Sequence, residues 1–325
     1  MKGREGINGR ILYGRTNFGR TRFFILILLL TACQSQPGET PSPSSSIYLP
    51  LTQTQPLPAP AIPPTAIPTL TNTPATEPRC TQPGFVQQDT LASQWAGTLA
   101  YRVYYPPCYT EDRAYPTLYL LPGNIHTDSI WDDMGIDETA DSLIFSGSIS
   151  PLLIVMADGG WLAQNSSGGP GSYESVVFDE LIPHVEATTC AWAAPQGRAI
   201  GGLSRGGYWA LEIAFRHPAS FAGVGGHSAA LLDTYAGPSI NPRYTGLSQN
   251  LGDLRIYLDI GRDDYVITPL LALHDEMTAQ QIVHTWLLNE GRHEEAYWTS
   301  HLADYLRWYG SLWEGEGTAV PSCKN

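Results

Sequence analysis

The sequence is poor in positive charge. It has 18 Lys and Arg residues against 31 Asp and Glu, which gives a formal net charge of -13 and a pI near 4.9. An acidic surface repels phosphate backbones and anionic lipid headgroups. The composition therefore argues against nucleic-acid binding.

Cysteine is also scarce, and the motifs that bind metals are missing from the sequence. The chain has five cysteines and eight histidines, without a CxxC pair or a Cys/His cluster of zinc-site spacing. One acidic cluster, formed by Asp132, Asp133, Asp137 and Glu138, could bind calcium, but a solvated surface is the favoured interpretation. We therefore predict no metal and no cofactor.

The N-terminal apolar run is too short to cross a membrane. Phe23–Leu30 has eight residues, whereas a spanning helix needs about 20. A basic stretch precedes the run, which is the layout of a secretory signal. Leu30-Thr31-Ala32-Cys33 follows and resembles a bacterial lipobox, whose cysteine carries the lipid. We predict that residues 1–33 are a lipoprotein signal peptide and that Cys33 tethers the protein outside the cytoplasm; a signal peptide without lipidation is the alternative.

Residues 34–79 have the composition of a stalk. They contain 12 of the 26 prolines, together with eight threonines and five serines. Such a segment cannot bury a core and favours an extended conformation, with a reach on the order of 140 Å at about 3.1 Å per residue. A proline-rich ligand for a partner domain is the less favoured interpretation. The folded domain should therefore comprise residues 80–325.

Apolar runs and helix-like segments alternate in this domain, and no internal repeat is visible. We expect strands at 85–90, 97–105, 117–121, 152–157, 198–201, 221–225, 254–260 and 283–288, and helices at 173–187, 205–217, 270–281 and 297–313. The first two strands adjoin, and later strands are separated by helices. This order predicts an α/β fold with a mostly parallel central sheet, an antiparallel N-terminal hairpin and helices on both faces.

The strongest motif is the segment Gly202–Gly206, with the sequence GLSRG. It follows a short strand and precedes an apolar-periodic helix, which is the setting of a nucleophile elbow. The tight turn requires the two glycines, and it exposes the hydroxyl of Ser204 at a helix N-terminus that favours developing negative charge. We therefore predict Ser204 as a nucleophile.

A nucleophilic serine needs a base and an orienting acid, which follow it in the order acid, then histidine, in this fold. His293 directly follows an expected strand end, unlike His274, His284 and His301, which fall within or at the start of other elements. We predict His293 as the base.

The acid should follow the strand 254–260. Asp259 lies inside that strand, and Asp263 and Asp264 follow it. We favour Asp264 because it completes a Gly-x-x-Asp loop after the strand. For the oxyanion we predict the backbone N–H groups of Arg205, next to the nucleophile, and of Asn124, in the loop after strand 117–121.

Several blocks beside the elbow resemble the Putative esterase family of α/β hydrolases. The family includes feruloyl and acetyl-xylan esterases, S-formylglutathione hydrolase, enterochelin esterase and the mycolyltransferases. The resemblance rests on Tyr115–Gly123 with Trp131 downstream, on Glu180–Pro183, and on Gly291–His293 followed by Trp298. It implies an α/β-hydrolase fold and the triad Ser204, Asp264 and His293. Many members have His-Gly where this chain has Pro122-Gly123, which places details of the pocket in doubt.

Three residues are candidates for the wall of a substrate pocket. Trp131 belongs to the block after the oxyanion strand, Trp161 follows the strand 152–157, and His227 follows the strand 221–225. Ligands of open α/β sheets bind at the carboxyl ends of the strands. Trp161 is equally compatible with a packing role, and for His227 a role away from the substrate is the favoured one.

Four cysteines remain once Cys33 is set aside, which outside the cytoplasm implies disulfides. Facing residues of an antiparallel hairpin have a constant index sum. A turn centred near residue 94 gives a sum near 188, which is the sum for Cys80 and Cys108. Cys190 and Cys323 each follow a helix that should end on the face opposite the active site. We therefore predict the pairs Cys80–Cys108 and Cys190–Cys323.

Together these features predict an extracytoplasmic serine esterase that works through an acyl-enzyme. Acyl transfer to an alcohol, as in the mycolyltransferases, needs the same triad and stays open. A surface binding protein on an idle hydrolase scaffold is the second alternative, which an intact triad disfavours.

Overall fold

The structure, a computed structural model, describes residues 81–314 and 321–323. These residues belong to one compact unit, Asn72–Asn325. The predicted signal peptide, Cys33, the whole predicted stalk and Cys80 lie outside the described residues. None of the helices within the described ranges is long and apolar enough to cross a membrane.

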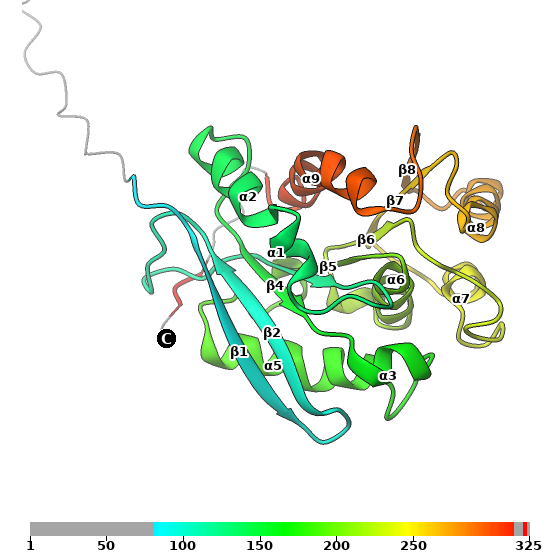
Figure 1. Cartoon of the computed structure of the whole chain (residues 1–325), viewed down its shortest axis with the longest axis horizontal. Helices are drawn as coiled ribbons and strands as arrows, with labels where there is room; N and C mark the ends of the chain where they lie inside the picture. The colour runs from blue at the N-terminus through cyan, green and yellow to red at the C-terminus, as the bar shows by residue number, and fades with distance from the viewer. Residues whose placement is uncertain (1–80, 315–320, 324–325) are drawn as a thin grey trace, which may run out of the picture. The chain divides into compact units, whose positions relative to one another are not determined.

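Eight strands form a single sheet in the order β1-β2-β4-β3-β5-β6-β7-β8 (Figure 1). Their bounds are β1 Phe85–Ser93, β2 Gly97–Tyr105, β3 Thr117–Leu121, β4 Leu153–Ala157, β5 Arg198–Leu203, β6 Gly223–His227, β7 Arg255–Gly261 and β8 Thr285–Asn289. β1 pairs with β2 and β2 with β4 in antiparallel fashion, and all other pairs are parallel. The predicted mostly parallel sheet with an antiparallel N-terminal hairpin is confirmed.

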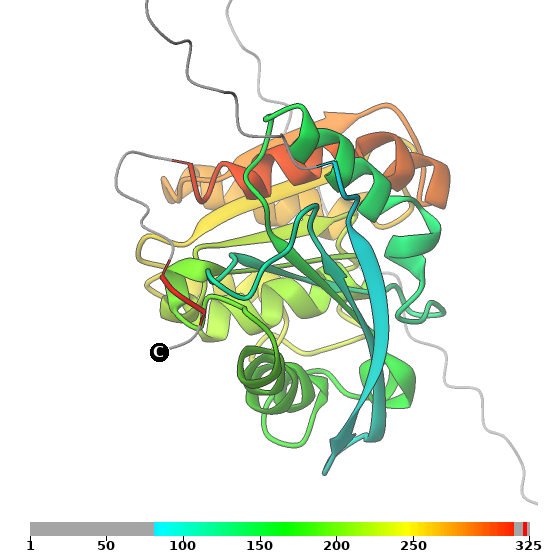
Figure 2. The same cartoon turned by 90° about the vertical axis from the view of Figure 1, so that its left-hand side faces the viewer.

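Helices cover both faces of the sheet. They are α1 Ile130–Asp133, α2 Ile136–Phe145, α3 Gly160–Asn165, α4 Tyr173–Ser175, α5 Ile182–Thr188, α6 Arg205–Arg216, α7 Pro242–Ser248, α8 Ile267–Ala279 and α9 Glu295–Gly310. Figure 2 shows the sheet between α2 and α9 on one side and α5 and α6 on the other. The two layers expected from the sequence are therefore present.

The central strands bury side chains on both faces, as their continuous apolar runs predict. In β3, Leu118 and Leu120 belong to the cluster formed with α2 and α9, whereas Tyr119 and Leu121 belong to the cluster formed with α6. All five residues of β3 and all five of β4 are buried. The sheet is thus anchored from both sides, which fixes the strand ends where the candidate site lies.

The helix predicted over residues 173–187 is divided by a π-helical segment, Val176–Leu181, between α4 and α5. α1, α2, α3 and α7 were not predicted. In α2, Asp137 and Glu138 lie in the first turn, where carboxylates interact favourably with the helix dipole. These two members of the acidic cluster therefore have a structural role in a helix.

The β1–β2 hairpin differs in register from the prediction. Phe85 pairs with Tyr105 and Ser93 with Gly97, which corresponds to an index sum of 190. The connection has three residues, and Ser93 Oγ accepts hydrogen bonds from the N–H groups of Trp95 and Ala96 at 3.1 and 2.9 Å. This loop shifts the centre of the turn from residue 94 to residue 95, so the predicted register, in which residues 80 and 108 face each other, is wrong by two in the index sum.

The cysteine pairs have different outcomes. The predicted Cys190–Cys323 disulfide is present, with Cα atoms 5.1 Å apart, which is within the normal range. Cys80 lies outside the described residues, so its pairing with Cys108 stays a prediction. Cys108 Sγ lies 3.7 Å from the carbonyl oxygen of Gln82, which brings Cys108 close to the chain two residues after Cys80.

Candidate active site

Ser204 lies in a strained turn between β5 and α6. Its φ and ψ are 56° and −117°, an uncommon conformation for a residue other than glycine. A Cβ on Gly202 would stand 2.3 Å from the backbone carbon of Gly206, and one on Gly206 would stand 2.2 Å from the Leu121 oxygen. The two glycines are therefore required by close approach of the backbone, as the sequence pattern predicts.

The side chains of Ser204, His293 and Asp264 form a hydrogen-bonded chain. His293 Nε2 lies 2.8 Å from Ser204 Oγ, and His293 Nδ1 lies 3.0 and 2.9 Å from the two Asp264 carboxylate oxygens. In the neutral tautomer that fits this pattern, Nδ1–H donates to Asp264 and Nε2 accepts from the serine hydroxyl. The Asp264 and His293 side chains are buried, so little water competes for these bonds.

Two loops hold Asp264 and His293 together. The Asp264 N–H donates to the Gly261 carbonyl at 3.2 Å, and its Oδ1 accepts from the Val266 N–H at 2.9 Å. The Asp263 N–H donates at 3.0 Å to the carbonyl of Gly291, in the loop that carries His293. The side chain of Asp263 itself points to solvent, and this explains why the neighbouring aspartate, and not Asp263, reaches the histidine.

Three side chains around His293 complete its environment. The Tyr265 ring centroid lies 4.6 Å from the His293 ring, and the Trp298 ring meets it edge-on at 5.1 Å. Burial lowers the pKa of His126; Glu295 opposes this effect, and the neighbouring His293 adds to it. The sequence reasoning missed Tyr265 and His126, although one directly follows Asp264 and the other lies two residues after Asn124.

The loop that contains Asn124 lies beside the elbow, because Leu121 of β3 pairs with Gly202 of β5. Within the described chain, the backbone N–H groups of Asn124 and Arg205 donate to no other residue. Their role as oxyanion donors stays a prediction. The Arg205 side chain is buried and points elsewhere, donating to the carbonyl oxygens of Ala163 and Ser166.

Of the three predicted pocket residues, Trp161 alone is accessible. It lies on α3 with 73% of its surface exposed. Trp131 and His227 are buried, so neither side chain is accessible to a substrate in this structure; for His227 a role away from the substrate is the favoured interpretation. Trp131 Nε1 donates to the Leu121 carbonyl at 3.1 Å, and its ring meets the His227 ring edge-on at 6.0 Å. His227 ends β6, but its side chain is not exposed, because it points towards α9 and contacts the Tyr309 hydroxyl.

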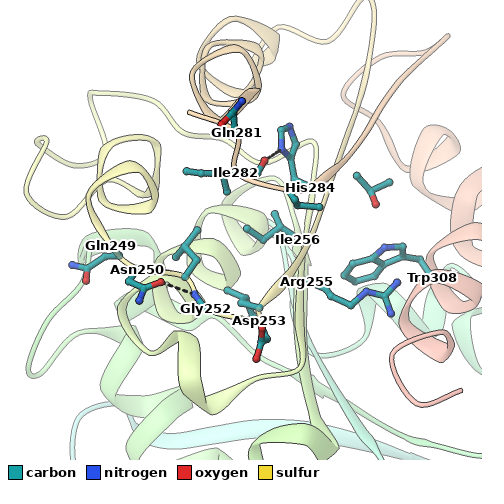
Figure 3. A pocket seen from close by; sticks show the side chains of 14 residues that line it. Gln249, Asn250, Gly252, Asp253, Arg255, Ile256, Gln281, Ile282, His284 and Trp308 are labelled. Atoms are coloured by element: carbon teal, nitrogen blue, oxygen red, sulfur yellow. Dashed lines mark hydrogen bonds between the residues drawn. The ribbon is translucent and has the colours of Figure 1, made fainter. Parts of the chain in front are cut away.

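The structure also contains a cavity of about 600 Å³ at the opposite end of the sheet (Figure 3). It is lined by Arg255 and Thr285, the first residues of β7 and β8, and by Trp308. Asp264 and His293 follow the other ends of the same strands. The cavity is therefore separate from the hydrogen-bonded chain of Ser204.

No described group of three or more His, Cys, Asp or Glu side chains is arranged to hold a metal ion. In the acidic cluster, Asp132 pairs with Arg102, which also binds Asp128 at 3.1 Å. Burial, followed by the neighbouring Glu138, raises the pKa of Asp137 to about 6. Within the described residues, Asp132 is thus used in an ion pair, and Asp137 and Glu138 lie in the first turn of α2.

The sheet order, the elbow and the loops after β7 and β8 define an α/β hydrolase. The model of the Putative esterase family matches residues 96–309, which is more than half of the chain. The chain belongs to this family.

Individual relatives agree with this assignment. An esterase of Mycobacterium tuberculosis is 34% identical over 171 residues, which covers 50% of this chain and 34% of that protein. An endo-1,4-beta-xylanase/feruloyl esterase of Xylanibacter ruminicola is 32% identical over 151 residues, covering 42% of this chain and 20% of its own. This chain thus spans about a third or less of the length of these two relatives.

Solved structures show the same fold. A ferulic acid esterase superposes with a TM-score of 0.66 and 25% identity, covering 72% of this chain and 100% of that one. An S-formylglutathione hydrolase of Staphylococcus aureus has a TM-score of 0.60 and 16% identity, covering 70% of this chain and 99% of its own. The second likeness concerns the fold alone.

Proposed function

We propose that this protein hydrolyses carboxylic esters through Ser204, with His293 as base and Asp264 as the orienting acid. The observation that carries the proposal is the chain of hydrogen bonds from Ser204 Oγ through His293 to Asp264, at 2.8 to 3.0 Å. A serine in a strained turn at a helix N-terminus, joined to such a pair, is the arrangement that activates a hydroxyl for attack. Membership in an esterase family supports the reaction class.

The reaction has two halves. Ser204 Oγ attacks the ester carbonyl carbon while its proton passes to His293 Nε2, and the resulting oxyanion accepts hydrogen bonds from the Asn124 and Arg205 N–H groups. Collapse breaks the bond to the alcohol, which takes the proton from His293. Water, deprotonated by His293, then attacks the acyl-enzyme, and the acid departs as Ser204 is restored.

The acyl group should meet an apolar surface. Ile125, Trp161 and Tyr265 are all exposed, by 85, 73 and 74%, and each follows the carboxyl end of a different strand, β3, β4 or β7. These are the strand ends at which ligands bind in open α/β sheets. Relatives named as feruloyl esterase and acetyl esterase indicate two acyl groups to test, one aromatic and one small.

We place this activity outside the cytoplasm, on a lipid tether. The support is the predicted lipoprotein signal ending at Cys33, the stalk of residues 34–79, and the Cys190–Cys323 disulfide. Disulfides persist in oxidising compartments. The substrate would then be a soluble or glycan-linked ester within reach of the stalk.

A fluorophosphonate probe tests the nucleophile. The wild-type protein should be labelled and should hydrolyse aryl acetate and feruloyl esters, whereas Ser204→Ala should do neither. Ser228→Ala is the matched control, because Ser228 follows the adjacent strand β6 and also has a positive φ, 47°. Labelling that survives Ser204→Ala, or that is lost in Ser228→Ala alone, would contradict the proposal.

A further inference from the structure

A second histidine–aspartate pair lies directly behind Ser204. His227, at the end of β6, and Asp259, on β7, are both fully buried. His227 Nδ1 lies 2.7 Å from Asp259 Oδ1, and His227 Nε2 lies 3.0 Å from the Tyr309 hydroxyl. In the neutral tautomer that fits this pattern, Nδ1–H donates to Asp259 and Nε2 accepts from Tyr309. The pair does not face the candidate site, so the proposed reaction leaves it without a role.

The other Asp259 oxygen is held by α9. Asp259 Oδ2 accepts from the hydroxyls of Tyr297 at 2.7 Å and Tyr305 at 2.8 Å. Burial, with Asp259 next, raises the pKa of both tyrosines well above the usual value, so both remain protonated donors. With His227, three donors surround one buried carboxylate, which is the compensation that a buried charge requires.

One end of this network reaches the backbone of Ser204, whose N–H donates to the His227 carbonyl at 2.9 Å. The other end reaches the loop of His293. The Tyr297 hydroxyl accepts from Asn289 Nδ2 at 3.1 Å, and the Tyr297 ring stands 2.5 Å from where a Cβ on Gly291 would lie. Tyr297 therefore packs directly behind the turn that leads to His293.

We propose that Asp259 and Tyr297 are positioning residues, which fix the His293 loop relative to the back of the nucleophile elbow. The inference rests on the proposed function of Ser204 and His293. Asp259 lies on β7, the strand that precedes Asp264. It joins β7 to His227, whose carbonyl contacts the Ser204 turn, and to Tyr297, which packs against the His293 loop. Reaction rates respond steeply to small displacements of reacting groups. Removing the hydrogen bond between Asp259 and Tyr297 should therefore slow the chemical step without weakening substrate binding.

Two tyrosines provide a matched test, because Tyr297 and Tyr305 donate bonds of nearly equal length to the same oxygen, but Tyr297 alone contacts the His293 loop. Tyr297→Phe and Tyr305→Phe should both lower Tm, Tyr297→Phe somewhat more because its hydroxyl also accepts a hydrogen bond from Asn289. Tyr297→Phe should lower kcat about tenfold with KM within about twofold of wild type, whereas Tyr305→Phe should lower kcat no more than about twofold. Asp259→Asn, if it folds, should lower kcat further than either.

The outcomes separate the two proposals. If wild-type protein neither hydrolyses an aryl ester nor reacts with a fluorophosphonate, the proposed function fails. If wild type is active and the two tyrosine variants lose the same fraction of kcat, the network is a stability element and the positioning role is overturned. A rise in KM at constant kcat in Tyr297→Phe would overturn it as well.

Discussion

Glu212 should make the stability of this protein fall as the pH rises. It lies on α6 and is fully buried, and within the described residues neither carboxylate oxygen accepts a hydrogen bond, although Arg216 Nε lies 3.4 Å from Oε1 and opposes the effect of burial on the pKa of Glu212. Burial, followed by the neighbouring Glu174, raises the pKa of Glu212 to about 9. Glu212 is therefore protonated in the folded protein at neutral pH, whereas in the unfolded chain it ionises near pH 4.3.

The size of the effect follows from proton linkage. The folded pKa is raised, so the contribution of Glu212 to stability is complete below about pH 4.3 and is lost as the pH rises towards 9. Within this window the free energy of unfolding falls by about 1.4 kcal/mol for each pH unit. Between pH 5.5 and 8.0 the loss from this one group should be about 3 kcal/mol.

Urea unfolding at several pH values between 5.5 and 8.0 measures this slope. Glu212→Gln keeps the size of the side chain and cannot ionise, so its free energy of unfolding should exceed that of wild type by an amount that grows with pH. Glu174→Gln is a companion variant, because the Glu174 carboxylate helps to raise the pKa of Glu212 and its removal should make the pH slope shallower. Hydrogen bonds from His217 and the Gly169 N–H lower the pKa of Glu174 against the effect of burial, so its loss should destabilise the protein throughout this range. Parallel pH curves for wild type and Glu212→Gln would refute the reasoning.

Three further predictions concern other parts of the chain. Asp264→Asn should lower kcat on the order of 10³–10⁴-fold because the histidine loses its orienting acid, while Asp263→Asn, at an exposed position, should stay near wild type; steady-state kinetics would expose the reverse ranking. Cys190→Ser should lower the free energy of unfolding by up to about 5 kcal/mol, since the disulfide closes a loop of 133 residues; equal urea midpoints for variant and wild type would contradict this. In a bacterium that processes lipoproteins, wild type should enter the detergent phase and Cys33→Ser should not, because stable anchoring needs the attached chains; equal partitioning would exclude the anchor.

Most of the sheet could be predicted because its signals are local. Continuous apolar runs marked β3 and β4, and the two glycines around Ser204 marked the turn between β5 and α6. The hairpin register could not be predicted, since it depends on a three-residue loop that Ser93 stabilises through its side chain. The acidic residues at the start of α2 were interpreted as a surface cluster because their favourable interaction with a helix dipole is invisible until the helix is known.

The candidate site was predicted as far as chain order and strand ends allow. The structure brings Ser204, His293 and Asp264 together, and their catalytic roles stay a prediction. The burial of His227 could not be predicted, because a position at a strand end does not indicate on which face of the sheet the side chain lies. Tyr265 was missed for a related reason, since its contact with His293 joins two loops that are far apart in the sequence.

The Cys190–Cys323 bond gives the domain a covalent topology with a practical consequence. Ser204, Asp264 and His293 all lie between these two cysteines, so the three side chains of the proposed triad are carried on one closed ring of chain. A protease that cuts any exposed loop of this ring opens it into a linear segment, and both fragments remain joined. After a single cut by an extracellular protease, the molecule would still keep all three residues in one covalently joined unit.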